Sequence, residues 1–253
     1  MIPKVIHYCW FGRNPLPESA VKCIESWRKF MPDYEIKEWN EDNFDVNMIP
    51  FTTEAYSVGK YAFVSDYARF WVLYHYGGVY FDTDVEVIKP IDDIVEKGAF
   101  MGVEEICKVT PEDLVGYPMV APGLGIGTPA GTDFYKQLLD FYEGAHYLNE
   151  DGSVIQGTVV AHTTRLLIKA GLQKSPDLQH VAGLWIYPED YFNPFEDITG
   201  RLRITDRTRS IHWYARTWQK QNPVKLWLSR MSHRLFGLVL FKLRRKLGFF
   251  IKY

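Results

Sequence analysis

The first forty residues alternate between two apolar runs and one helical pattern, and this order constrains the fold more than any other feature. Lys4 to Phe11 predicts a buried strand. From Pro17, apolar side chains recur every three or four residues until Pro32, as in a helix that packs on a core. Tyr34 to Trp39 predicts a second strand. A β-α-β unit of this kind favours an α/β fold with a parallel, doubly wound sheet.

The rest of the chain continues this alternation. We expect one long aromatic helix from Ala55 to Tyr76, ended by the Gly77-Gly78 pair, because glycine readily adopts the left-handed conformation at a helix end. A strand from Val79 to Ile88 follows at once. Further helices are expected over 131–145 and 156–170, and further strands over 100–103, 184–187 and 210–214.

Size and composition indicate one sizeable folded domain with an appendage. The chain has 253 residues, of which 47% are apolar and 24% charged, and these values exclude disordered and fibrous classes. The cysteines, Cys9, Cys23 and Cys107, are odd in number and widely spaced. They therefore predict neither a disulfide framework nor a CxxC metal site, and a reducing compartment is expected.

Charge divides the chain into an acidic body and a basic end. All 31 acidic residues lie at or before Asp206, whereas 12 of the 29 Lys and Arg residues follow it. We predict a domain over 1–222 and a basic amphipathic helical tail over 223–253 that binds an anionic membrane surface. The alternative is a helix packed on the body. The many Leu and Phe residues among these bases argue against nucleic acid as the partner.

Targeting signals are not expected from the sequence. The amino terminus has no long apolar region with a signal-peptide cleavage site, and the longest apolar stretch, 235–241, is far shorter than the ~20 residues that span a bilayer. We therefore expect a cytoplasmic protein that is peripheral on the inner face of the membrane.

An Asp-x-Asp pair carries the clearest chemical signal. Residues two apart on a strand face the same side, so Asp82 and Asp84 are predicted to project together. Paired carboxylates repel each other unless a cation lies between them, and Mg²⁺ or Mn²⁺ takes oxygen ligands of this type together with substrate phosphates. Upstream, Asp66 and Arg69 are spaced to be neighbours on one helix face. Because apolar residues surround them, we expect this pair to be buried with a specific partner rather than on the surface.

The order Ser65-Asp66-x-x-Arg69, a helix, Gly77-Gly78-x-Tyr80-x-Asp82-x-Asp84 resembles the signature of glycosyltransferase family 32. This family includes fungal mannosyltransferases, bacterial capsule enzymes and, more distantly, the clostridial glucosylating toxins. The opening segment 2–12, the segment 187–194 and the segment 212–218 are also similar to the family. The resemblance implies a GT-A fold, with a Rossmann-like mixed sheet flanked by helices, and a retaining hexosyltransferase that uses a nucleotide-diphosphate sugar with Mn²⁺ or Mg²⁺.

The resemblance also implies roles for individual residues. Trp10 matches the residue that stacks on the nucleotide base, and Tyr8, Tyr80 and Trp218 are further donor-binding candidates. Asp66, Arg69 and Asp82 match contacts to the donor sugar or ribose, and Asp82, Asp84 and His212 are the expected metal ligands. Gln156, a polar residue at a predicted helix start, is a candidate for a position near the reacting carbon.

The function expected from these features is transfer of a sugar, with a UDP-linked donor favoured, to a saccharide or lipid-linked acceptor in cell-surface or capsular polysaccharide synthesis. Two alternatives stay open. One is a phosphatase of the haloacid dehalogenase type, whose strand also ends in Asp-x-Asp. The other is a non-catalytic membrane adaptor that binds a sugar nucleotide.

Overall fold

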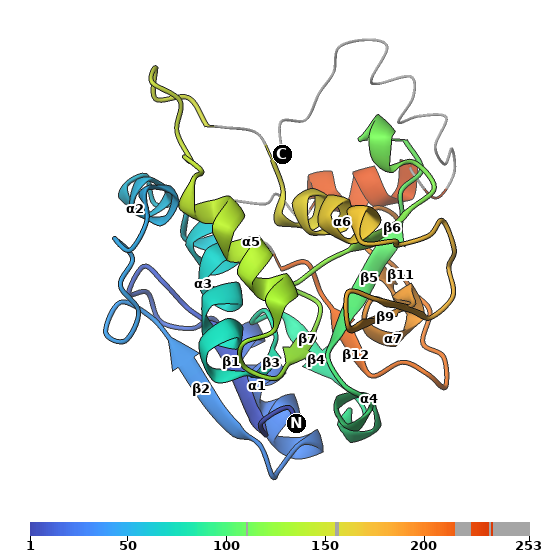
Figure 1. Cartoon of the computed structure of the whole chain (residues 1–253). Coiled ribbons are helices and arrows are strands. Elements are labelled where there is room, and N and C mark those ends of the chain that lie inside the picture. Colours follow the sequence, from blue (N-terminus) through green and yellow to red (C-terminus); the bar gives the residue numbers. More distant parts are fainter. Residues whose placement is uncertain (110, 155–156, 216–223, 233, 235–253) are drawn as a thin grey trace.

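The computed structural model describes residues 1–109, 111–154, 157–215, 224–232 and 234 (Figure 1). Their centre is an eight-stranded sheet in the order β2-β1-β3-β7-β5-β9-β8, with β6 paired to β5. Its strands are β1 (Val5–Cys9), β2 (Glu35–Trp39), β3 (Gly78–Tyr80), β5 (Phe100–Ile106), β6 (Pro118–Val120), β7 (Ile126–Thr128), β8 (Gln179–Val181) and β9 (Leu184–Tyr187). Two smaller sheets pair β4 (Val85–Val87) with β12 (Ser210–His212), and β10 (Phe195–Glu196) with β11 (Arg201–Leu202).

The predicted β-α-β unit is confirmed. Strands β1 and β2 are parallel and in register from Val5 opposite Glu35 to Cys9 opposite Trp39. Helix α1 (Glu18–Phe30) connects them and buries Ala20, Cys23, Ile24 and Trp27. Its apolar spacing thus forms one core-facing stripe, as the sequence predicts.

The strands that matter for the site run in one direction. β3 is parallel to β1, β5 is parallel to β9, and the antiparallel β7 lies between β3 and β5. The carboxyl ends of β2, β1, β3, β5 and β9 therefore lie at the same edge of the mixed sheet. In open α/β sheets this is the edge where ligands bind.

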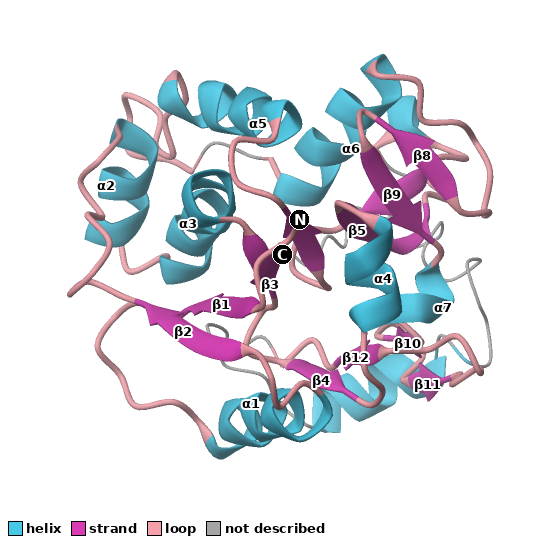
Figure 2. Ribbon diagram, turned by 60° about the horizontal axis from the view of Figure 1, so that its bottom comes forward, coloured by secondary structure: helices cyan, strands magenta, loops and turns pink. Residues whose placement is uncertain are grey.

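Helices cover both faces of the sheet, which confirms the expected mixed α/β class (Figure 2). Helices α3 (Tyr61–Tyr76), α5 (Asp133–Glu143) and α6 (Val159–Lys169) share one hydrophobic cluster with Tyr80 and Met101. Helices α1 and α4 (Asp92–Lys97) share a second cluster with Val79 and Phe81 on the other face. The remaining helical segments are α2 (Pro50–Ser57), the 3₁₀ turn Glu112–Leu114 and α7 (Glu189–Phe192).

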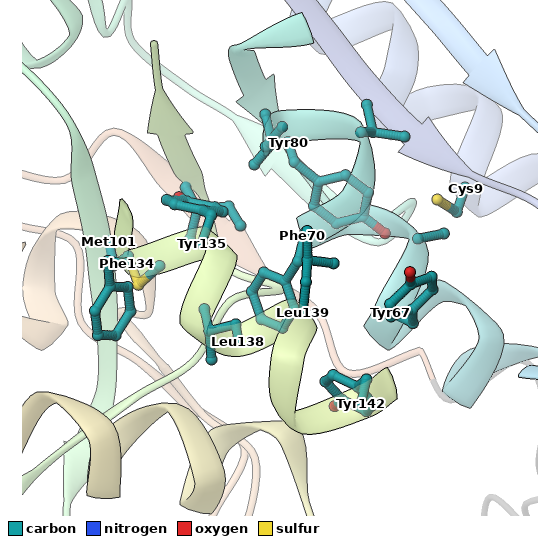
Figure 3. Close-up of a cluster of buried hydrophobic side chains, with 14 of the residues drawn as sticks. Cys9, Tyr67, Phe70, Tyr80, Met101, Phe134, Tyr135, Leu138, Leu139 and Tyr142 are labelled. Atoms are coloured by element: carbon teal, nitrogen blue, oxygen red, sulfur yellow. The ribbon is translucent and has the colours of Figure 1, made fainter. Parts of the chain in front are cut away.

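The high aromatic content of the chain is used in the first of these clusters (Figure 3). Phe70 on α3 meets Tyr135 and Tyr142 on α5, with ring centroids 6.0 and 6.3 Å apart. Tyr67 lies edge-on to Tyr142 at 5.9 Å. Such contacts hold α3 rigidly against the sheet and α5, and α3 is the helix that carries Asp66 and Arg69.

The prediction of one helix from Ala55 to Tyr76 is wrong. The segment forms two helices, α2 and α3, separated by Val58–Lys60. Gly59 between them has φ of 69°, a left-handed conformation that an α-helix does not accept. The predicted end of α3 is confirmed, since Gly77 follows its last residue with φ of 66°.

The prediction of one strand from Val79 to Ile88 is also wrong. The chain leaves the large sheet after β3, turns at residues 83–84, and enters β4 of a separate two-stranded sheet. The backbone N–H of Val85 donates to the carbonyl of Asp82 at 3.1 Å and closes this turn. The two aspartates are therefore positioned by a turn and not by alternation along a strand.

The other expected elements are present with small changes in their ends. Helices α5 and α6 lie within the predicted ranges. Strands β5, β9 and β12 match the expected strands. The three cysteines are buried and are not joined by disulfides. In the described parts of the chain no helix has the length and apolar character needed to cross a bilayer.

Candidate functional site

A buried arginine joins α3 to the loop after β3. One terminal nitrogen of Arg69 lies 2.9 Å from Asp66 Oδ1 and 3.3 Å from Asp82 Oδ1, and the Arg69 side chain is 5% exposed. Arg69 Nε also donates to the carbonyl of Ser65 at 3.1 Å. The predicted Asp66–Arg69 pair is thus buried, and its partner is Asp82.

Charges in this group influence each other strongly. Burial disfavours the charged guanidinium, but Asp82, Tyr80 and Asp66 outweigh it and raise the pKa of Arg69. Burial raises the pKa of Asp66, despite the opposing effect of Arg69. Arg69 is therefore a fixed cation shared by two carboxylates, and it leaves neither of them as an isolated buried charge.

Tyr80 binds the same oxygen of Asp82 as Arg69 does. Its hydroxyl donates to Asp82 Oδ1 at 2.9 Å, and its ring lies 5.0 Å from the guanidinium carbon of Arg69. Tyr80 itself is buried. Its position makes it a support for Asp82 and Arg69, whereas Asp82 keeps a partly exposed carboxylate at the sheet edge.

Asp84 and His212 meet where β4 pairs with β12. Register places His212 opposite Val85, and His212 Nε2 lies 3.1 Å from Asp84 Oδ1. The backbone N–H of Ala215 donates to Asp84 Oδ2 at 2.8 Å. Burial opposes ionisation of Asp84, but His212 and this N–H lower its pKa, and Asp84 in turn raises the pKa of His212 against the effect of burial.

Asp82, Asp84 and His212 form a group that fits a divalent cation. One potential ligand atom from each of them lies within 4.8 Å of the others. Two carboxylates and an imidazole suit a borderline-hard ion such as Mn²⁺, and the carboxylates alone suit Mg²⁺. The structure thus brings together the three residues that the resemblance gives as metal ligands, from segments 128 residues apart.

Gly123 is a site residue that the sequence reasoning missed. The N–H of Asp82 donates to the carbonyl of Gly123 at 3.1 Å, and a Cβ on Gly123 would lie 2.0 Å from Asp82 Oδ2. Only a residue without a side chain fits there. The glycine-rich run 123–127 is the signal that could have indicated it. This run does not complete the G-x-G-x-x-G pattern of a dinucleotide-binding loop, so it did not point to a ligand site.

Tyr214 is a second residue that the sequence did not indicate. Its ring lies 4.2 Å from the ring of His212, and its hydroxyl donates to Glu104 Oε1 at 2.9 Å. Asn193 Nδ2 donates both to the Tyr214 hydroxyl and to the carbonyl of Glu104, each at 2.8 Å. These contacts tie β12 to β5 and to the segment after α7.

A cavity of about 400 Å³ lies beyond these contacts, at the carboxyl ends of β5 and β9. Charged side chains of both signs line it, among them Lys108, Glu189, Glu196 and Arg203. Burial raises the pKa of Glu189, and Lys108 only partly offsets this effect. The cavity therefore offers both hydrogen-bond donors and acceptors. Asp82, Asp84 and His212 do not line it, and the hydrogen bond from Asn193 to Tyr214, whose ring contacts His212, connects the two.

The predicted donor-binding residues are spread along the same edge. Trp10 follows β1, is partly exposed, and donates from Nε1 to the carbonyl of Asn14 at 2.6 Å. Tyr8 is buried and donates to Glu38 Oε2 at 2.6 Å. Gln156 and Trp218 lie outside the described residues.

A family comparison agrees with the sequence resemblance. Residues 17–101 match the model of the glycosyltransferase sugar-binding region containing a DXD motif. The matched segment, about a third of the chain, includes Asp66, Arg69, Asp82 and Asp84. The predicted resemblance to the DXD glycosyltransferases of family 32 is confirmed over these residues.

Curated relatives match a similar part of the chain. Inositol phosphoceramide mannosyltransferase 1 of Schizosaccharomyces pombe is 33% identical over 111 residues, which are 40% of this chain and 33% of that protein. Mannosyl phosphorylinositol ceramide synthase CSH1 of Saccharomyces cerevisiae is 30% identical over 105 residues, 40% of this chain and 28% of that protein. The chain thus spans about a third of the length of these relatives.

Two solved structures are similar at lower identity. PaToxG glycosyltransferase has a TM-score of 0.46 at 19% identity, with 66% of this chain and 69% of that chain covered. The galactosyltransferase LgtC, in complex with donor and acceptor sugar analogues, has a TM-score of 0.44 at 12% identity, with 91% and 94% covered.

Proposed function

We propose that this chain, which carries the DXD sugar-binding region of glycosyltransferase family 32 over residues 17–101, transfers a hexosyl group from a nucleotide-diphosphate sugar with retention of configuration. The observation that carries the proposal is the convergence of Asp82, Asp84 and His212 within 4.8 Å at the ligand-binding edge of the sheet, beside Arg69. A group with this composition has no evident structural purpose, since hydrophobic packing would stabilise the fold without it.

Some residues of the site would bind the metal, and others would bind the donor sugar. Asp84 and His212, with one oxygen of Asp82, would hold Mn²⁺ or Mg²⁺, which when bound neutralises the charge of the leaving diphosphate. Asp82, held by Arg69 and Tyr80, presents its partly exposed carboxylate to hydroxyl groups of the donor. Because Arg69 is anchored before the donor arrives, the site needs little reorganisation during the reaction.

Retention is proposed to occur by attack of the acceptor on the same face that the diphosphate leaves. A retaining glycosidase uses a free carboxylate as nucleophile, ~5 Å from a second carboxyl group. Here Asp66 and Asp82 both bind Arg69, and Asp84 binds His212 and the N–H of Ala215. None of the three is an unengaged nucleophile, so a covalent intermediate on them is not expected.

We propose that the acceptor binds in the cavity at the ends of β5 and β9. This cavity lies at the same sheet edge as the metal candidates, and Tyr214, Glu104 and Asn193 connect the two. Saccharide hydroxyls both donate and accept hydrogen bonds, so a lining of both charges suits a neutral saccharide. We propose a saccharide or lipid-linked saccharide acceptor, as in the synthesis of cell-surface or capsular polysaccharide.

The identity of the donor sugar and of its nucleotide base can be tested directly. The fungal relatives are named mannosyltransferases, which makes mannose the first sugar to examine, and UDP- and GDP-linked donors should be compared. We expect Mn²⁺-dependent hydrolysis or transfer with one donor, and NMR of the product should show the anomeric configuration of the donor retained. Turnover of p-nitrophenyl phosphate with Mg²⁺, with no turnover of any nucleotide sugar, would instead support a phosphatase. Tight nucleotide binding without turnover on a wide acceptor panel would support an adaptor.

A further inference from the structure

Residues 224–232 form a helix whose inner side is fixed to the β10–β11 hairpin (Figures 1 and 2). Arg230 forms a salt bridge of 2.8 Å with Asp197 Oδ1, and its guanidinium lies 5.3 Å from the centre of the Phe195 ring. Arg234 donates to the carbonyls of Thr199 and Gly200 at 2.6 and 3.0 Å. Two bases of the predicted tail thus bind the body of the protein, and this part of the tail is packed on it.

Large apolar side chains of this helix are exposed. At 100° per residue, Val224 and Leu228 lie roughly 120° and 160° away from Arg230 around the helix axis, and Trp227 lies roughly 60° away. The exposed fractions are 63% for Val224, 61% for Trp227 and 55% for Leu228. The packed helix therefore presents large apolar side chains to solvent.

The hairpin that carries the helix exposes apolar residues too. Ile198, Leu202 and Ile204 are among its exposed large side chains. We group them with Val224, Trp227 and Leu228 of the helix that is packed on the hairpin, and we call these six residues the outer apolar face. Monomeric soluble domains rarely gather so many exposed large apolar residues in two adjacent segments, and such groupings mark interaction sites.

Basic residues accompany the outer apolar face. Arg201, Arg203, Lys225 and Arg234 are exposed in the same two segments. The acidic residues of the hairpin have local partners: Asp197 binds Arg230, and Glu196 accepts from the Thr199 hydroxyl at 2.6 Å. No acidic residue follows Asp206 in the sequence. The face combines apolar surface with net positive charge.

We propose that the outer apolar face docks on the surface of an anionic lipid bilayer. Leu, Ile, Val and Trp side chains next to Arg and Lys are the composition of interfacial helices, which insert apolar groups and attract anionic headgroups. A nucleic acid would contact the basic groups but leave the apolar side chains exposed. An apolar protein partner would cover the apolar side chains but leave the basic groups without anionic partners. Glu196 and Arg203 of the hairpin also line the 400 Å³ cavity, so docking holds this cavity beside the bilayer.

The test uses the full-length protein and vesicles of phosphatidylcholine with or without phosphatidylglycerol. We expect co-sedimentation only with phosphatidylglycerol, and a Trp227→Glu/Leu228→Glu variant should bind at least tenfold more weakly. Val21→Glu, on the exposed side of α1, is the matched control and should bind as the wild type does. Melting temperature and Mn²⁺-dependent nucleotide binding, measured on each variant, separate loss of docking from unfolding or loss of the active site.

Three results would overturn the proposal. The first is unchanged vesicle binding by the double variant, which would assign any membrane affinity to other residues. The second is equal binding to vesicles with and without phosphatidylglycerol. The third is concentration-dependent self-association that the double variant abolishes without any effect on vesicles, because the face would then bind a second copy. If the double glutamate variant melts early, Trp227→Ser/Leu228→Ser is measured by the same criteria.

Discussion

Arg69 on helix α3 lies 3.3 Å from Asp82 on the loop after β3, and this contact fixes the loop to a helix that is itself held by aromatic packing. The carboxylate at the sheet edge thus has a rigid support behind it. The same guanidinium binds Asp66, so one planar group positions two acids. This geometry predicts that transfer activity depends strongly on the planar shape of the cation at position 69 as well as on its charge.

Arg69→Lys should therefore lose most transfer activity. A lysine ammonium keeps the charge, but it cannot reproduce a planar fork that reaches Ser65, Asp66 and Asp82 together. We expect at least a tenfold lower transfer rate in a steady-state assay. A rate within twofold of the wild type would show that the charge alone is sufficient.

Tyr80→Phe should lower the turnover number with little change in stability. The substitution removes the hydrogen bond to Asp82 Oδ1 and keeps the ring under Arg69. One hydrogen bond to a charged group corresponds to about 1.5 to 3 kcal/mol, so the rate should fall by at least about tenfold if the bond positions Asp82 for the reaction. Tyr34→Phe, just before β2 and away from the site, removes a hydrogen bond to the carboxylate of Asp92 and is the control. Equal effects of the two variants on activity would contradict the role of Tyr80.

Gly123→Ala should displace Asp82. The new methyl group would lie 2.0 Å from Asp82 Oδ2, so the carboxylate or the loop must move. We expect more than a tenfold loss of Mn²⁺-dependent donor binding. Gly144→Ala, at the end of α5, meets no atom within 4 Å and should bind the donor normally. Normal binding by the Gly123 variant would exclude this loop from the site.

Stability should fall as the pH is lowered through the range in which His7 titrates. Burial lowers the pKa of His7 from 6.5 to about 4, although its bond to the carbonyl of Gly77 acts in the opposite direction. Below pH 6.5 the unfolded chain therefore binds a proton that the folded protein binds only near pH 4. The contribution of neutral His7 to the free energy of unfolding is fully present above pH 6.5, and about 3 kcal/mol of it is lost when the pH falls to 4.

Urea unfolding at several pH values tests this prediction. The wild type should lose more stability between pH 7.5 and 4.5 than His7→Gln, which keeps a donor and an acceptor but does not titrate there. His75→Gln, at an exposed position, should follow the wild type. Parallel curves for the wild type and the His7 variant would contradict the assignment.

The sequence predicted the elements whose signals are local. Periodicity located α1 and its buried side chains, and the Gly77-Gly78 pair located the end of α3. It also located the Asp66–Arg69 pair, because charges within an apolar helix need a partner. The break at Gly59 was missed, since a single glycine in a long aromatic run interrupts the helical pattern only weakly.

The rest of the site depends on contacts between distant segments. Strand alternation predicted that Asp82 and Asp84 would converge, and they do, but a turn brings them together. The position of His212 follows from the pairing of β12 with β4, which local pattern does not encode. The same holds for Gly123, whose close approach to Asp82 depends on how β7 enters the sheet between β3 and β5.

The central claim is that Asp82, Asp84 and His212 bind a divalent cation that in turn binds the donor. Mn²⁺ binding measured by electron paramagnetic resonance, with and without UDP or GDP, tests it most directly on the wild type and on Asp84→Asn. The account predicts a Mn²⁺ site that one of these nucleotides tightens, and at least tenfold weaker Mn²⁺ binding in a variant with an unchanged melting temperature. Equal Mn²⁺ affinity in the two proteins, or nucleotide binding that does not respond to Mn²⁺, would contradict it.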